Sequence, residues 1–217
     1  MARVRVHNFS VSVDGYAAGP DQDTDRPLGV GGSALHEWIF QTRYGRRMIG
    51  QEGGDSGLDD EFMVQRDQGI GTTIMGRNMF GPIRGPWGDT PWSGWWGPSP
   101  PYHHPVFVLT HYPHLPIEMK GGTTFHFITG GVDEALRQAL IAADGKDVLV
   151  GGGAATIRQY LSARLIDEIH LAVVPILLGR GEQLFESLTL SRDDYRCVEH
   201  RCSSSVIHLR FAKSAAG

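Results

Sequence analysis

The chain begins with hydrophobic and polar residues in alternation over residues 3–13, and this period of two predicts a β-strand. Further along, short runs rich in apolar residues have the length of strands that are buried on both faces. These runs predict strands at residues 72–75, 106–110, 124–128, 147–150 and 167–175. Near the C-terminus, residues 194–200 and 204–212 predict an antiparallel hairpin.

Apolar residues at helical spacing lie between several of these strands. They predict helices at residues 35–44, 59 or 60 to 67, 132–143 and 154–161. Glycine, aspartate and proline predict loops at 18–34 and 50–57. Strands separated by helices indicate one α/β domain over residues 1–217, with a mostly parallel central sheet flanked by helices and an antiparallel C-terminal hairpin.

One long segment, residues 81–105, interrupts this pattern. Its aromatic residues, set among many glycines and prolines, are Trp87, Trp92, Trp95, Trp96 and Tyr102. A loop of this length inside a compact domain is usually functional. We interpret it as an insertion, and two roles stay open: a surface flap held by aromatic packing, or a wall of a substrate pocket or dimer contact.

The overall composition narrows the class of protein. The chain has 217 residues, of which 20 are Lys or Arg and 24 are Asp or Glu, a formal net charge of -4. This balance argues against a nucleic-acid or anionic-membrane partner. No run approaches the roughly 18 apolar residues of a membrane span, and the N-terminus lacks the apolar stretch of a signal peptide. We therefore expect a cytoplasmic protein.

The cysteines and histidines do not indicate a metal site. Cys197 and Cys202 have no metal-type spacing and are expected to be free thiols. The histidines around the second half of the insertion, His103, His104, His111 and His114, fit no common metal motif either.

The clearest chemical motif is a strand that runs into three glycines and then a helix. Gly151, Gly152 and Gly153 leave room for backbone N–H groups to approach a ligand, and Ala154 to Thr156 begin the helix. A helix N-terminus carries about half a positive charge, so the turn can seat a phosphate or pyrophosphate. A purely structural tight turn would have the same sequence.

A second strand ends in the same way. Gly76 is followed by Arg77 and Asn78 at the start of a predicted helix. A guanidinium there can bind a phosphate with two parallel hydrogen bonds, although a solvated surface arginine is the alternative. A dinucleotide has more than one phosphate position, so two such strand ends are more informative together than either is alone.

The first strand ends at Asp14-Gly15, and small residues follow at Ala17 and Ala18. A carboxylate at a strand end can bind substrate or relay a proton, so Asp14 is a candidate catalytic residue. The alternative is that Asp14-Gly15 is only a turn.

These motifs, in this order and approximate spacing, resemble the dihydrofolate reductase-like fold. The resemblance covers Val11–Gly19, Ile74–Phe80, Val106–Thr110 and Val148–Phe185. Within the last range, Asp167-Glu168, Pro175, Leu178-Gly179-Arg180-Gly181 and Leu184-Phe185 are similar to one branch of that fold. That branch is the reductase domain of the bifunctional riboflavin-biosynthesis deaminase–reductase and its stand-alone relatives.

The resemblance implies an NADPH-dependent reductase of a small heterocyclic, carbonyl or imine substrate. It places the adenosine phosphates at Gly76, Arg77 and Asn78 with Thr110 near the adenosine. It places the pyrophosphate at Gly151, Gly152, Gly153, Ala154 and Thr156, and the nicotinamide beside Ala17 and Ala18. It also implies a homodimer.

Two departures qualify this expectation. The zinc motif of the riboflavin deaminase half is missing, which argues against a direct copy of the bifunctional enzyme's role. Folate enzymes place an acid on the helix before the Gly-Arg strand, where Asp59, Asp60 or Glu61 stands in this chain. A pterin reductase that uses one of these acids, and a binding module without turnover, are therefore alternatives.

Overall fold

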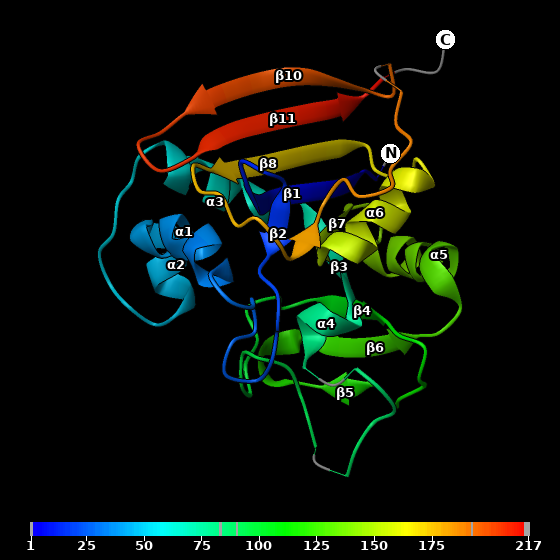
Figure 1. Cartoon of the computed structure of the whole chain (residues 1–217). Coiled ribbons are helices and arrows are strands. Elements are labelled where there is room, and N and C mark those ends of the chain that lie inside the picture. Colours follow the sequence, from blue (N-terminus) through cyan, green and yellow to red (C-terminus); the bar gives the residue numbers. More distant parts are fainter. Residues whose placement is uncertain (1, 83, 90, 192, 215–217) are drawn as a thin grey trace.

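The computed structural model describes residues 2–82, 84–89, 91–191 and 193–214, and in these residues the main sheet has nine strands (Figure 1). Their order is β10-β11-β8-β1-β7-β3-β4-β6-β5. The strands that pair in parallel are β1 (Val4–Ser12), β3 (Ile70–Gly76), β4 (Pro105–Leu109), β6 (Thr124–Ile128), β7 (Asp147–Gly152) and β8 (Glu168–Val174). The antiparallel strands at the two edges are β5 (Ile117–Glu118), β10 (Tyr195–Cys202) and β11 (Ile207–Lys213).

Helices cover both faces of this sheet (Figure 1). On one face lie α1 (Glu37–Gln41), α2 (Arg43–Met48) and α3 (Leu58–Arg66), and on the other lie α5 (Gly131–Ala143) and α6 (Ala154–Ser162). The period-two alternation of β8 shows why: Ile169 and Leu171 pack in the core with α5 and α6, whereas Ala172 and Val174 pack with Trp38. The predicted α/β fold class, with its C-terminal hairpin, is confirmed.

Some local predictions are wrong in their details. The predicted 18–34 loop is preceded by β2 (Tyr16–Ala18), which pairs with β9 (Glu182–Gln183), and it runs into a 3-10 helix, η1 (Gly32–His36). The predicted 35–44 helix is broken at Thr42, which is extended at φ -74 and ψ 156. Its hydroxyl accepts a hydrogen bond from Gly45 N and so caps the second helix. A short 3-10 turn, η2 (Lys120–Gly122), follows β5.

The insertion packs onto the end of the sheet formed by β4 and β6. Trp87, Trp92 and Tyr102 contact a core cluster that includes Phe80 and Phe125. Phe80 belongs to α4 (Arg77–Phe80), and its carbonyl accepts a hydrogen bond of 2.9 Å from Trp92 Nε1. The described part of residues 81–105 is therefore anchored by aromatic packing, as the flap interpretation expects.

Candidate active site

A cavity of about 650 Å³ opens at the carboxyl ends of the parallel strands. Ligands of open α/β sheets bind at this edge, because the strand ends and the N-termini of the following helices meet there. Ten residues that the sequence nominated for a cofactor line the cavity: Ala17, Ala18, Gly76, Arg77, Asn78, Thr110, Gly151, Gly153, Ala154 and Thr156. The tertiary structure thus brings together the two glycine strand ends, which lie 75 residues apart at Gly76 and Gly151.

The three glycines after β7 have different structural roles. Gly152 has φ +128, and a Cβ there would lie 3.0 Å from Phe9 Cε2, so the backbone itself requires glycine. Gly153 precedes α6 with φ -71, and nothing lies within 4 Å of the place of its Cβ. The first turn of α6 has no side-chain cap. Thr156 N donates to Gly153 O at 3.0 Å, so the N–H groups of Ala154 and Ala155 are the ones available to a ligand in the cavity.

Arg77 is held in place from three sides. Nη1 donates to Thr110 Oγ1 at 2.9 Å, Nη2 donates to Gly85 O at 3.2 Å, and the guanidinium lies 3.2 Å from the centre of the Trp87 ring. Partial burial lowers the pKa of Arg77 below its usual value. Among the described residues, no carboxylate lies within 4.0 Å of Arg77, so this oriented cation has no anionic partner from the chain.

Residues of β1, α3 and the insertion also line the cavity. Four consecutive residues of β1, His7 to Ser10, line it together with Arg66 of α3. The insertion contributes Trp95, Trp96 and Tyr102, so it forms part of the pocket wall as well as an anchored flap. Burial and the nearby Arg5, Arg210 and Arg66 lower the pKa of His7 to about 3, so its ring is neutral at pH 7.

Asp14 lies elsewhere. Its carboxylate accepts hydrogen bonds from Leu178 N at 3.1 Å, Gly179 N at 2.7 Å and the Ser12 hydroxyl at 2.6 Å. These contacts lower the pKa of Asp14, the Ser12 hydrogen bond most, and they join the end of β1 to the segment after β8. Asp14 is not among the described residues that line the cavity, and this geometry favours the turn over the catalytic role.

The three acids considered for a pterin reductase, like Asp14, make their polar contacts outside the cavity. Asp59 accepts from His208 Nε2 at 2.9 Å, Asp60 accepts from Tyr44 N at 2.7 Å, and Glu61 forms an ion pair of 3.5 Å with Arg201. None of them is among the described cavity-lining residues, and this geometry argues against a direct acid from these three residues at this cavity. The helix α3 presents Met63 and Arg66 to the cavity instead.

Sequence reasoning missed several residues of the site. His7, Asn8, Arg66 and Glu182 line the cavity, and Glu182 lies beside Ala18 in the pairing of β2 with β9. Glu182 follows directly on the Gly-Arg-Gly string that carried the family resemblance, which was the one available signal. Within the described residues, no group of three or more His, Cys, Asp or Glu is arranged to hold a metal ion.

Comparison with known proteins gives one family. The model of the RibD C-terminal domain family matches residues 4–209. Protein YwjB of Bacillus subtilis is 27% identical over 163 residues, which are 65% of this chain and 78% of YwjB. Protein YyaP of the same organism is 36% identical over a shorter stretch of 61 residues, 28% of this chain and 32% of YyaP.

Solved structures support the same fold. A putative riboflavin biosynthesis protein from Shewanella sp. PV-4 aligns with a TM-score of 0.61 and 23% identity, covering 99% of this chain and 100% of that one. RibD of Acinetobacter baumannii aligns with a TM-score of 0.56 and 17% identity, covering 99% of this chain and 59% of RibD. Dihydrofolate reductase from Enterococcus faecalis, complexed with NADP(H), aligns at 0.51 and 12% identity, covering 99% of this chain and 97% of the reductase.

Proposed function

The chain belongs to the RibD C-terminal domain family, and we propose that it is an NADPH-dependent reductase of a small heterocyclic, carbonyl or imine substrate. One observation carries the proposal. The uncapped N-terminus of α6, the open space at Gly153 and the unpaired cation of Arg77 meet at one cavity among the described residues. A ligand that fits this arrangement has at least two separate anionic groups and a substantial neutral part.

NADPH has these features, and each of its parts would be held by different residues of the cavity. Gly153 and the first N–H groups of α6 would bind the pyrophosphate, and Arg77, oriented by Thr110, would bind the 2′-phosphate. Ala17 and Ala18 would leave space for the nicotinamide. When bound, the cofactor supplies the hydride, and the protein supplies binding, orientation and electrostatics.

The other residues of the cavity would shape and shield the substrate side. Trp95, Trp96 and Tyr102 provide an aromatic wall that excludes water from one side. Glu182, which pairs with Ala18 between β9 and β2, would deliver a proton near the nicotinamide position. Asp14, the carboxylate that the sequence suggested for this role, lies outside the cavity.

A two-part experiment tests this function. Calorimetric titration first measures binding of NADPH and NADH to the wild type and to Gly153→Val, which fills the proposed pyrophosphate position. Absorbance at 340 nm then follows NADPH oxidation with pterins, ribosylaminopyrimidines and simple carbonyls. Tight NADPH binding with turnover supports the reductase, whereas binding without turnover across the panel supports the non-catalytic module. An absence of NADPH binding refutes both.

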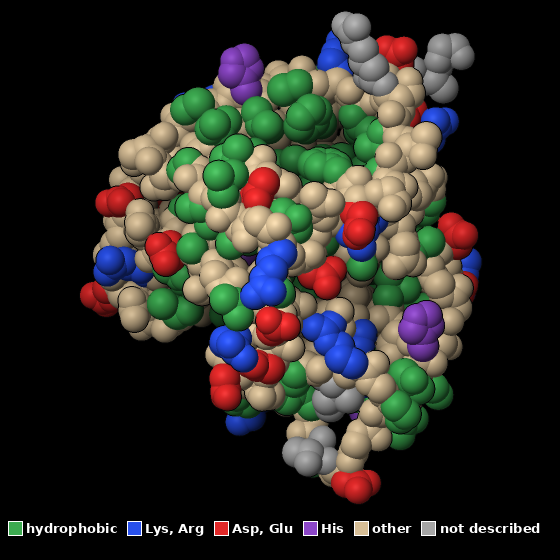
Figure 2. All heavy atoms as spheres, in the orientation of Figure 1, with side chains coloured by type: hydrophobic (Ala, Val, Ile, Leu, Met, Phe, Trp, Pro, Cys, Tyr) green, Lys and Arg blue, Asp and Glu red, His purple; other side chains and the backbone are tan. Residues whose placement is uncertain are grey.

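Assembly and location are part of the proposal. We expect a homodimer, because large apolar side chains are exposed at Val13 after β1, at Leu177 after β8 and at Phe185 after β9. On the face shown in Figure 2, basic and acidic side chains are interspersed, and this supports a small-molecule substrate rather than nucleic acid. No helix in the described part of the chain is long and apolar enough to cross a membrane, and we propose a cytoplasmic location.

A further inference from the structure

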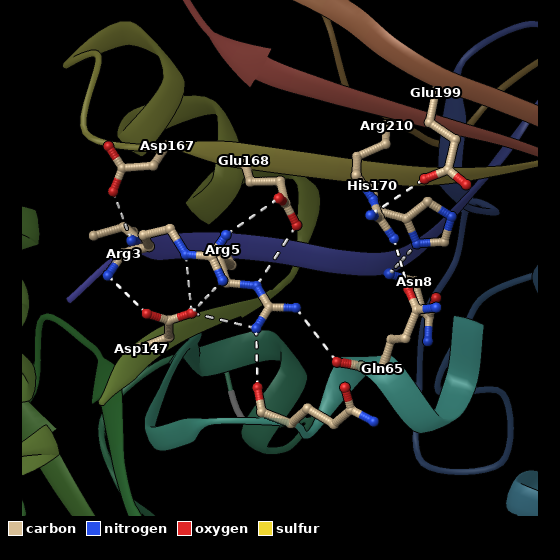
Figure 3. A network of polar contacts seen from close by, with 12 residues as sticks. Arg3, Arg5, Asn8, Gln65, Asp147, Asp167, Glu168, His170, Glu199 and Arg210 are labelled. Atoms are coloured by element: carbon tan, nitrogen blue, oxygen red, sulfur yellow. Dashed lines mark hydrogen bonds and ion pairs between the residues drawn. The ribbon is translucent and has the colours of Figure 1, made fainter. Parts of the chain in front are cut away.

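A chain of hydrogen bonds runs through the interior behind the cavity wall. Asp59 at the start of α3 accepts from His208 Nε2 at 2.9 Å, and His208 Nδ1 lies 3.0 Å from His170 Nε2. His170 Nδ1 then accepts from the backbone N–H of Asn8 at 3.1 Å (Figure 3). Both histidine rings are almost completely buried, with exposed fractions of 0% for His170 and 1% for His208.

The two ends of this chain determine where its protons are. The Asn8 N–H can only donate, so His170 Nδ1 must be the acceptor and carry no proton. Burial, His7, His208 and Arg210 all lower the pKa of His170, so this ring is neutral and its proton is on Nε2. His170 therefore donates to His208 Nδ1, and His208 donates through Nε2 to Asp59. Every hydrogen bond of the chain points in one direction.

The chain cannot carry a proton to the substrate, because it ends at a peptide N–H that has no proton to spare. An additional proton on His170 would occupy Nδ1 and leave two donors, His170 Nδ1–H and Asn8 N–H, facing each other. Burial and the charges of Arg5, Arg210 and Arg66 also lower the pKa of the neighbouring His7 and so disfavour a proton there. The arrangement is therefore suited to holding a conformation rather than to relaying protons.

The conformation at its end is unusual and lies in the wall of the cavity. The pairing of β1 with β8 shifts register between Val6 and Phe9, and Asn8 has φ 53, a left-handed value that is unfavourable without support. Asn8 is anchored through its side chain as well, since Nδ2 donates to Phe62 O at 3.0 Å and lies 3.2 Å from Met63 Sδ. The bulge and the residues after it, His7 to Ser10, form the β1 part of the cavity wall.

Packing around the histidines leaves them few alternatives. The Phe62 ring stacks on both, with ring centres 4.4 Å from His170 and 4.1 Å from His208. Trp38 and His208 make a T-shaped contact, with ring centres 5.6 Å apart. Since these neighbours are apolar at the contact, a broken link of the chain would leave a buried polar atom without a partner.

We propose that Asp59, His208 and His170 are positioning residues that hold the β1 bulge at Asn8 and thereby set the shape of the cavity wall. The proposal rests on the proposed function only in taking this cavity as the reaction site. It gives Asp59, nominated from sequence as a direct acid, an indirect role through two histidines. Asp60 and Glu61 have no part in this chain.

The small number of asparagines in the protein allows a direct test of this proposal. The sequence contains only two asparagines, Asn8 and Asn78, so protein labelled with ¹⁵N-asparagine gives two backbone amide signals. Asn8 reports on the bulge, and Asn78 reports on the proposed cofactor side of the cavity. The spectra are recorded on the full chain, with and without NADPH.

Two substitutions at one histidine separate positioning from packing. In His170→Asn, an amide oxygen can stand near the place of Nδ1 and accept from Asn8 N–H, although the link to His208 is lost. This variant adds a third labelled amide, at position 170, which is recognised as the signal that the wild type lacks. In His170→Gln, the amide stands near the place of Nε2, so the Asn8 N–H loses its acceptor. We expect His170→Gln to shift the Asn8 signal and to speed its amide exchange by roughly twofold to tenfold, the effect of one hydrogen bond. His170→Asn should stay close to the wild type in both.

A second pair acts at the other end of the chain. Asp59→Ala removes the terminal acceptor, and Glu61→Ala removes a carboxylate from the same helix turn without touching the chain. Both lose the same favourable interaction with the helix dipole, so that effect cancels. We expect the Asn8 signal to move in Asp59→Ala and to remain in place in Glu61→Ala.

Several results would overturn the proposal. The Asn8 signal could shift equally in His170→Asn and His170→Gln, or equally in Asp59→Ala and Glu61→Ala. Either result would mean that these residues act through packing alone and not through the hydrogen bonds. If the His170 variants do not fold, the Asp59 and Glu61 pair decides alone. Movement of Asn78 on NADPH addition tests the proposed function separately, so either idea can fail while the other stands.

Discussion

Replacing Arg77 with alanine tests whether this cavity discriminates NADPH from NADH. The two cofactors differ by the 2′-phosphate, and Arg77 is the oriented cation that the proposal assigns to it. Its guanidinium is fixed by Thr110 Oγ1 at 2.9 Å, by Gly85 O at 3.2 Å and by the Trp87 ring. Because the side chain is already ordered, little conformational entropy is lost when a phosphate binds.

The expected magnitude follows from this geometry. Hydrogen bonds to a charged group contribute about 1.5–3 kcal/mol. Arg77 is only partly buried, so solvent and salt screen the interaction, and the lower half of this range applies. Arg77→Ala should therefore weaken NADPH binding by roughly 1.5–2 kcal/mol, about 10- to 30-fold, and leave NADH binding almost unchanged. Arg77→Lys should recover part of the loss, since it keeps the charge without the planar fork.

Calorimetric titration of both cofactors at two salt concentrations is the assay. Arg84→Ala is the matched control, because Arg84 also lines the cavity but donates to Gln22 Oε1 at 2.9 Å. Equal losses for NADPH and NADH in Arg77→Ala would refute the 2′-phosphate role. So would a loss that does not decrease at high salt, because a phosphate contact must be screened.

The other predictions concern the turn, the proton source, a buried histidine and assembly. Gly153→Val should keep the melting temperature and weaken NADPH binding by roughly 1–3 kcal/mol, whereas Gly152→Val should lower the melting temperature because of its φ of +128; the reverse pattern would contradict the assignment. Glu182→Gln should cut single-turnover NADPH oxidation at least about tenfold and Asp14→Asn should not, so a slow Asp14→Asn enzyme would restore the catalytic role of Asp14. The pKa of His7 falls from 6.5 to about 3 on folding, so the unfolded chain binds a proton first as the pH drops. Urea unfolding at pH 7 and pH 5 should therefore show that the free energy of unfolding falls by about 2 kcal/mol through this group. His7→Phe should abolish this share of the pH dependence, and a variant with the same pH dependence as the wild type would disprove the role of His7. Light scattering at micromolar concentration should give about twice the 23.8 kDa chain mass, and a monomer would argue against the dimer.

The sequence by itself determined the elements whose signals are local. The period of two over residues 3–13 and the apolar runs before Gly76 and Gly151 predicted strands that the structure contains. The glycine strand ends also marked the cavity, because glycine after a buried strand and before a helix reflects a close backbone approach. These properties depend on neighbouring residues alone, so they can be read without knowing the fold.

Other features depended on the orientation of side chains around a local element. Asp59, Asp60 and Glu61 are consecutive on α3, so they point in directions about 100° apart. None faces the cavity, and Met63 and Arg66 do. The helix rotation is set by packing of Phe62 and Met63 against the sheet, which the short amphipathic pattern did not specify.

The tertiary structure alone decided the chain of hydrogen bonds through His208 and His170, and the β1 part of the cavity wall that this chain supports. Asn8 and His170 are 162 residues apart, and they meet because β1 pairs with β8. An extra residue at the bulge also changes which side chains share a face, and the alternating pattern of 3–13 gives no sign of it. Strand order and bulges are selected by the summed packing of the whole sheet, and that sum is not present in any local stretch of sequence.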